Sequence, residues 1–493
     1  MKGDFSRETF DSVKHFSRVL QQQGRVQLDA DWNEQTAILL HYLRTLAADL
    51  IGPFAGPKDS RGFAISAVNN DDFNISAGRY YVDGILCEND QETSYNTQKD
   101  FPYPPEKREG GIEYLVYLDV WERHITALED DYIREKALGG PDTATRTKVV
   151  WQVKIDTGKG DLDSPPTKLN PGEVRTGWGD WIERWQPKHL GCLRARVDRP
   201  EDSNDPCLTA PDAKYRGQEN QLYRVEIHQG GMAGEATFKW SRDNGAVVSR
   251  VELSGTEWIA EKPLGFNAGN WVELTSDGQE LRGQPGTLVK LLKVEGDRFT
   301  LESPPVPTDK DWPTKVRRWD QRETGSLKLK DGAVGIKESD KEHDGIELEN
   351  GIQIQFMSTK KSGEAHHYRT SDYWLIPARV ATGDIEWPVK LDDAGKKILK
   401  DGKVDPIHQP PFGIRHHYAP LAILKADGTD PVECRCEITT PLNSCDMPSS
   451  GIDGIGGRPL CDPTIPRRTA RASTKSGGAD DTAALRRGKP KGV

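Results

Sequence analysis

The chain has 493 residues, of which 35% are hydrophobic and 29% are charged, and its formal net charge at pH 7 is −10. This length exceeds what one hydrophobic core supports, so we expect roughly two to four domains. The acidic balance excludes a general attraction to nucleic acid or to anionic lipid, because such binding depends on clustered Lys and Arg.

The sequence shows no sign of membrane insertion or secretion. No stretch approaches the roughly 18 continuous apolar residues of a membrane-spanning helix, so we expect a soluble chain without a membrane span. The N-terminal region carries acidic, amide and aromatic residues where a secretory signal would have an apolar segment. Seven cysteines, an odd number, argue against a disulfide framework. We therefore expect synthesis in the cytoplasm without a signal peptide.

Residues 11–51 are the most clearly helical region. Val13, Phe16 and Leu20 recur at helical spacing and Gly24 follows them, which predicts a short first helix.

A second, longer helix is predicted to follow. Asp31 and Glu34 have the spacing of a capping box just before an apolar run, so the helix should begin at Asp31. Gly52-Pro53 should end it.

The second helix carries a heptad pattern. Two interleaved sets recur every seven residues, namely Trp32, Leu39 and Leu46, and Thr36, Leu43 and Leu50. Such a seam either lies on the chain's own β domain or joins like helices in an oligomer. Both interpretations stay open from the sequence.

Beyond residue 57 the pattern is that of short strands joined by Gly and Asn turns. We predict a mainly β fold, with an N-terminal helical segment followed by antiparallel β-sandwich domains. The expected regions are the helical segment (1–56), a first β domain (57–165), a β-sandwich (166–262 and 303–425), a small β-barrel inserted in it (263–302), a Cys-rich segment (426–465) and a disordered basic C-terminal tail (466–493).

Three tryptophans occur within eight residues. Trp178, Trp181 and Trp185 are a candidate ligand platform, because aromatic faces stack on sugars. The same residues also serve as core filler between β layers, which we favour.

Four of the seven cysteines lie close together near the C-terminus. Cys434, Cys436, Cys445 and Cys461 are a candidate structural zinc site, since zinc takes four soft ligands. The Cys-x-Cys spacing is not that of the usual zinc knuckle, so disulfides and unpaired thiols are alternatives. No other cofactor is expected.

Catalytic patterns are weak. His366, His367, His408, His416 and His417 lack a metal-binding spacing. Acidic residues near 119–131 are explained by the charged edges of a sheet. No nucleophile elbow, P-loop or dinucleotide fingerprint occurs in a suitable context, so we expect no enzyme activity.

Several stretches together carry a family resemblance: residues 1–10, 22–35, 80–86, 118–129, 137–146, 219–227, 238–244, 372–382 and 416–421. They resemble a family of uncharacterised proteins encoded beside phage-tail-like contractile injection systems, whose members open with Met-Lys-Gly-Asp-Phe-Ser/Thr-Arg. Residues 24–34 and 81–84 are also similar to the start of phage baseplate and tail-fibre attachment proteins.

The resemblance implies a non-enzymatic structural subunit that first lies in the cytoplasm and then in an assembled or released particle. Its partners would be other particle subunits and further copies of itself, with a trimer favoured at a fibre position. Subunit contacts would be carried by Trp32, Leu39, Leu43, Leu46 and Leu50. The approach of the chain would be fixed by Arg25, Asp29, Asp31 and Glu34.

A second hypothesis comes from the tryptophan cluster. The chain would then be a cell-surface or polysaccharide-binding protein with glycan hydrolase activity, and a surface glycan would be its ligand. Some relatives of the resembled family continue into a parallel β-helix, whereas this chain ends in the Cys-rich segment and the basic tail.

Overall fold

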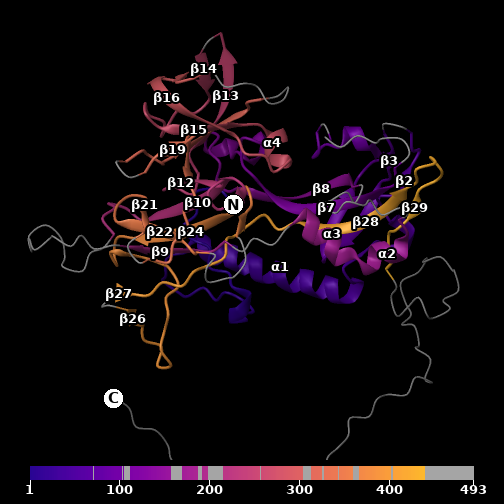
Figure 1. Cartoon of the computed structure of the whole chain (residues 1–493), viewed down its shortest axis with the longest axis horizontal. Helices are drawn as coiled ribbons and strands as arrows, with labels where there is room; N and C mark the ends of the chain where they lie inside the picture. The colour runs from indigo at the N-terminus through magenta and orange to yellow at the C-terminus, as the bar shows by residue number, and fades with distance from the viewer. Residues whose placement is uncertain are drawn as a thin grey trace, which may run out of the picture. The chain divides into compact units, whose positions relative to one another are not determined.

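The computed structural model describes most of the first 438 residues. The described ranges are 1–69, 72–102, 104, 112–156, 169–186, 191–197, 215–255, 257–303, 312–324, 327–341, 344–358, 366–400 and 403–438. They all belong to one compact unit, Met1–Thr439. The unit is mainly β, with one long helix near its N-terminus, which confirms the predicted fold class (Figure 1). The predicted basic tail lies outside the described residues.

The long helix α1 spans Asp29–Ile51. Gly52 ends it as predicted, with φ at 88° and its N–H donating to the carbonyl of Ala48. The predicted start at Asp31 is wrong. Leu28 precedes the first turn without a side-chain cap, and Asp29 and Asp31 both lie in that turn, where a negative charge favours the helix dipole.

The predicted first helix is also wrong. Only one 3₁₀ turn, η1 (Ser12–Lys14), forms there, and His15 ends it in the left-handed region with φ at 55°. Val13, Phe16 and Leu20 are all exposed. Helical spacing alone does not stabilise a short helix whose apolar side chains have no core to pack against.

The first β domain contains three antiparallel sheets. The largest has the order β29 (Val432–Glu433), β28 (His417–Leu424), β7 (Tyr114–Ile125) and β8 (Arg146–Asp156). The second sheet has the order β1 (Phe54–Ala55), β4 (Gly78–Val82) and β5 (Ile85–Asn89). The third has the order β2 (Ile65–Ser66), β3 (Asn74–Ile75) and β6 (Thr93–Ser94). One apolar core joins them. Strand β28 was expected in the sandwich, but it returns to pair with β7 because its apolar run matches the buried central strand.

The β-sandwich consists of a six-stranded sheet that packs against a three-stranded sheet. The six-stranded sheet has the order β19 (Leu329–Lys330), β20 (Ala333–Gly335), β12 (Thr237–Ser241), β10 (Gln221–Gln229), β24 (Tyr373–Arg379) and β25 (Asp384–Ile385). The three-stranded sheet has the order β21 (Ile346–Glu347), β22 (Ile352–Phe356) and β9 (Leu193–Val197). Strand β10 pairs antiparallel with β12, and Val225 lies opposite Trp240. Phe238, Phe356 and Trp374 lie in its core.

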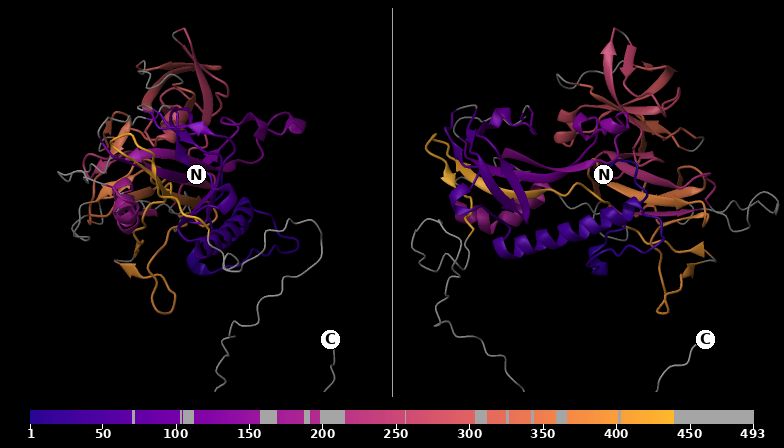
Figure 2. Two further views of the ribbon diagram at one scale, coloured as in Figure 1. Left: turned by 90° about the vertical axis from the view of Figure 1, so that its right-hand side faces the viewer. Right: turned by 180° about the vertical axis from the view of Figure 1, so that it is seen from behind.

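The inserted barrel is larger than predicted. Six strands close it, in the order β13 (Val248–Ser254), β14 (Glu257–Ala260), β17 (Arg298–Leu301), β16 (Thr287–Glu295), β15 (Trp271–Thr275) and β18 (Lys315–Trp319). The expected range 263–302 holds only three of them. Three short strands cannot close into a barrel, so the flanking segments complete it. The barrel rises above the two sheet domains (Figure 2).

Short elements complete the described fold: α2 (Pro171–Thr176), α3 (Trp178–Trp185), α4 (Asp277–Leu281), η2 (Lys58–Ser60), η3 (Tyr95–Thr97), η4 (Asp131–Ile133), η5 (Lys136–Leu138), and the pairs β11 (Gly231–Met232) with β23 (His367–Tyr368) and β26 (Leu399–Lys400) with β27 (Lys403–Val404). None of the helices in the described ranges combines the length and the apolar character needed to cross a membrane.

Candidate interaction surface

The first residues of the sequence are held by the sandwich. The Met1 amino group donates a hydrogen bond to the Tyr373 hydroxyl at 2.7 Å, and Lys2 Nζ lies 3.0 Å from a Glu226 carboxylate oxygen. The Gly3 N–H donates to the main-chain carbonyl of Asn244 at 3.2 Å. The first three residues of the sequence are therefore a structural anchor in this fold.

Glu226 is the centre of that anchor. The residue is buried and also contacts Arg224 at 2.6 Å and Lys239 at 3.4 Å. Burial raises the pKa of the Glu226 carboxyl, but Lys2 and Arg224 outweigh this and hold it well below its usual range. Sequence reasoning missed this network, because Lys2, strand β10 and strand β12 are far apart in the sequence and share no local motif.

Residues 5–28 form a strap that runs along α1 before entering it. The Ser6 N–H donates to the Asp29 carboxylate at 2.9 Å, and the Thr9 hydroxyl donates to Glu34 at 2.5 Å. Asp29 and Glu34 therefore hold the strap against the start of α1. Their predicted role in fixing the approach of the chain to a particle stays a prediction.

The other two residues predicted to fix the approach of the chain lie apart from these contacts. Arg25 is exposed and contributes its N–H to a turn with the carbonyl of Gln22. Asp31 is half-buried in the first turn of α1. Among the contacts of the described residues, neither side chain makes a hydrogen bond.

The inner face of α1 packs against the chain's own core. Ala30 and Ile38 are 1% exposed. Arg44 makes a bidentate pair with Glu122 of β7, at 3.0 and 2.7 Å. The β4–β5 turn comes so close that a Cβ added to Gly84 would lie 2.1 Å from the Arg44 carbonyl oxygen. The helix is therefore fixed against the first β domain.

The outer face of α1 is apolar and uncovered. Trp32, Leu39, Leu43, Leu46 and Leu50 are between 52% and 72% exposed, and Thr36 is exposed with them. We call these six residues the apolar seam. The chain's own fold does not use the seam, so the interpretation that it packs on its own β domain is wrong for these residues.

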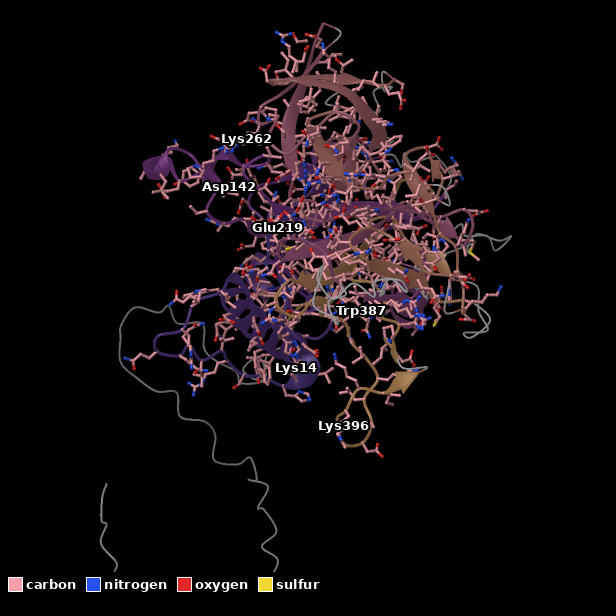
Figure 3. All side chains as sticks on the ribbon, turned by 90° about the vertical axis from the view of Figure 1, so that its left-hand side faces the viewer. Lys14, Asp142, Glu219, Lys262, Trp387 and Lys396 are labelled. Carbon is pink, nitrogen blue, oxygen red and sulfur yellow. The ribbon has the colours of Figure 1, made fainter. Side chains whose placement is uncertain are left out.

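Exposed apolar residues are concentrated around this helix. Thirteen of the 25 large apolar side chains exposed in the described ranges belong to residues 1–50. Scattered exposed apolar residues are normal, but a contiguous set of this kind marks an interaction site. Helix α1 lies along one side of the unit, and the region of the strap that holds Lys14 lies on the same side (Figures 2 and 3).

The tryptophan cluster lies inside the first β domain. Trp181 is 7% exposed, and Trp185 stacks on Tyr117 with ring centroids 3.7 Å apart. Trp178 meets Phe54 edge to face at 5.8 Å. This arrangement favours core packing over an open stacking platform.

The predicted zinc set is only partly described. Cys434 is buried and Cys436 is half-buried, and both are free thiols. Burial raises the pKa of the Cys434 thiol to about 12, which disfavours the thiolate that zinc needs. Cys445 and Cys461 lie outside the described residues, so the zinc site stays a prediction.

Three carboxylates gather between the first β domain and the barrel. Oxygens of Glu129, Asp277 and Glu280 lie within 4.8 Å of one another. Lys315 Nζ contacts them at 2.6, 2.7 and 2.7 Å, and Arg123 contacts Asp277 and Glu280. Two protein cations thus offset most of the negative charge of this cluster, which ties strand β7 to the barrel.

Asp119, one of the carboxylates weighed for catalysis, also has a structural role. It is buried and contacts Lys154 and His416, each at 2.7 Å. Burial opposes ionisation, but Lys154 and His416 lower the Asp119 pKa to about 2. The His416 ring lies near Trp121 and Tyr418, so this group ties β28 to β7.

A cleft of about 410 Å³ lies between the strap and β10, and its lining includes Arg242 and Arg379. Arg242 donates to Glu349 at 2.6 Å. Arg379 donates to Glu386 at 2.8 Å and to the Ser6 carbonyl at 3.0 Å. The arginines of the cleft are thus engaged by the chain itself. The apolar seam remains the feature without such internal partners among the described residues.

Comparison with known proteins gives one family match. A family model described as a family of unknown function (DUF6519) matches residues 1–164 and 186–493. Comparison with curated protein sequences and with solved structures gives no match. Because the match covers nearly the whole sequence, the chain belongs to the DUF6519 family of unknown function.

Proposed function

We propose that this protein is a non-enzymatic structural subunit of a phage-tail-like contractile injection particle, at a baseplate or tail-fibre attachment position. The observation that carries the proposal is the apolar seam. Its large side chains are exposed on one face of α1, while the opposite face of the helix packs on the chain's own core. The particle type comes from the sequence resemblance of the N-terminal pattern.

A further feature supports an assembly role. The charged groups buried between the domains are paired with one another, as in the network around Glu226 and the cluster around Lys315. Such pairs stabilise a rigid scaffold. The proposed partners are other particle subunits and further copies of this chain, with a trimer at a fibre position. The protein would be made in the cytoplasm and then carried in the particle.

The test is incorporation into particles. Leu43→Glu combined with Leu46→Glu places two charges on the seam and should abolish incorporation, measured by immunoblot of purified particles. Leu253→Glu combined with Leu264→Glu is the matched control, because both leucines are exposed on the barrel. Incorporation of the seam variant at the level of the control would contradict the proposal.

Point substitutions suit this test better than removal of residues 1–52. That deletion would also remove Lys2 from Glu226 and Ile38 from the core, so loss of folding would be confused with loss of docking.

The glycan-binding alternative receives less support, because Trp181 is buried and Trp185 stacks on Tyr117. A glycan array comparing the wild type with Trp178→Ala would separate the two proposals. Binding that this substitution removes would favour the alternative.

A further inference from the structure

We propose that the apolar seam of α1 packs against the same seam on a second copy of this chain, so that the protein forms a homo-oligomer through a helix-to-helix contact. This inference rests on the proposed function, because it names the first neighbour that the seam meets.

The spacing of the seam fits a helix as the partner. Trp32, Leu39 and Leu46 recur every seven residues, and Leu43 and Leu50 follow the interleaved series. A repeat of 3.5 residues keeps an apolar stripe facing a neighbouring helix along its length, with side chains of one helix entering spaces on the other. A pocket or a sheet edge as partner would not require this repeat.

The distribution of side chains on the helix indicates that the seam contacts another chain. The buried residues of α1 are Ala30 and Ile38, whereas the opposite face carries one Trp and four Leu that are each more than half exposed. An amphipathic helix that served only its own fold would have the reverse arrangement.

The charge around the seam favours a copy of itself as partner. The residues that border the seam along its two sides are Asn33, Leu40 and Ala47, and Gln35, Tyr42 and Asp49. Only Asp49 is charged. A charged partner would find no complementary charges there, whereas two copies of this face would meet with little like-charge repulsion.

The area of the seam is too small for a stable interface by itself, so the strap must contribute to the contact. The stripe from Trp32 to Leu50 is about 27 Å long and, at the width of one helix, covers roughly 300 Å². A stable interface needs about 800 Å² on each partner. The strap borders the seam, since the Val19 N–H donates to Gln35 at 2.8 Å, and it exposes Phe16 and Leu20. The interface therefore includes the strap as well as the helix.

The experiment measures the mass of the purified full chain by light scattering. The wild type should have the mass of two or more copies. Leu43→Glu with Leu46→Glu should have the mass of one copy, with an unchanged circular dichroism spectrum because both side chains are exposed on the single chain. Leu253→Glu with Leu264→Glu should keep the wild-type mass. Two copies with different C-terminal tags should co-purify, and the seam variant should lose this co-purification.

A wild type that is monomeric, or an oligomer that the seam variant leaves intact, would overturn the inference. The proposed function fails separately. If the wild type is monomeric and particle incorporation still depends on the seam, only the homo-oligomer is wrong. If seam-dependent oligomers form but never enter particles, only the particle role is wrong.

Discussion

At the scale of single residues, the buried charges around Glu226 decide how the N-terminal anchor responds to substitution. Glu226→Gln would leave the buried Arg224 without its carboxylate partner, whereas Lys239 would keep Glu273 at 2.5 Å; an uncompensated buried charge costs about 3–5 kcal/mol. Lys2→Met removes one of three cations and leaves Glu226 paired, so it should cost less, about 1–2 kcal/mol. Urea unfolding followed by tryptophan fluorescence measures both.

The matched control for this prediction is Lys293→Met. Lys293 pairs with Glu295 at 2.7 Å, but both side chains are 60% exposed. Such a surface pair contributes only about 0–1 kcal/mol. If Glu226→Gln were as mild as Lys293→Met, the Glu226 network would not be the anchor of the N-terminus.

At the scale of elements, the position of α1 depends on the close approach of the β4–β5 turn. Gly84 has φ at +77°, and an added Cβ would lie 2.1 Å from the Arg44 carbonyl oxygen. Gly84→Ala should therefore push the helix from the sheet, and hydrogen exchange should increase in Asp29–Ile51 while the barrel keeps its protection.

Gly296→Ala separates backbone strain from the steric clash in that experiment. Gly296 also has a positive φ, +61°, but no atom lies within 4 Å of its added Cβ. This variant should lose only about 1 kcal/mol from strain and should leave the exchange of α1 unchanged. Equal effects of the two substitutions on α1 would show that contact with Arg44 does not hold the helix.

At the scale of the whole molecule, buried histidines should make stability depend on pH. Burial lowers the pKa of His124 and of His228 to about 4, so the folded protein keeps both neutral while the unfolded chain protonates them below about 6.5. Stability should fall as pH drops from about 6.5 to 4, by up to about 1.4 kcal/mol per pH unit for each histidine. Urea midpoints between pH 7.5 and 4.5 measure this slope.

Buried carboxylates change the stability in a lower pH range, and there too the stability falls as the pH falls. Burial opposes the ionisation of Glu273, but Lys239 and Lys2 lower its pKa to about 2. Its contribution is present above the unfolded pKa of about 4.5 and is lost as pH falls toward 2. His228→Gln should thus reduce the slope above pH 5 and leave the loss below pH 4. A flat profile between pH 7.5 and 5 would contradict the histidine assignment.

Local pattern predicted a large part of this fold. The long helix and its end at Gly52 and the presence of an inserted barrel follow from periodicity and turn residues. The barrel's bounds and the return of β28 to β7 did not, because pairing between distant strands depends on contacts that no local pattern records. The prediction of a first helix was wrong because its apolar residues have no core to pack against, which local periodicity does not show.

The sequence by itself determined that α1 carries a stripe of large apolar residues every three or four positions, because helical geometry places such residues on one face. Only the tertiary structure decided which face meets the chain's own core. The absence of a side chain at Gly84 lets the β4–β5 turn approach the backbone of the helix at Arg44, and Leu43 and Leu46 are left exposed to solvent. The same holds for Lys2 and Glu226, whose pairing depends on a chain path that brings the first residues of the sequence to strand β10.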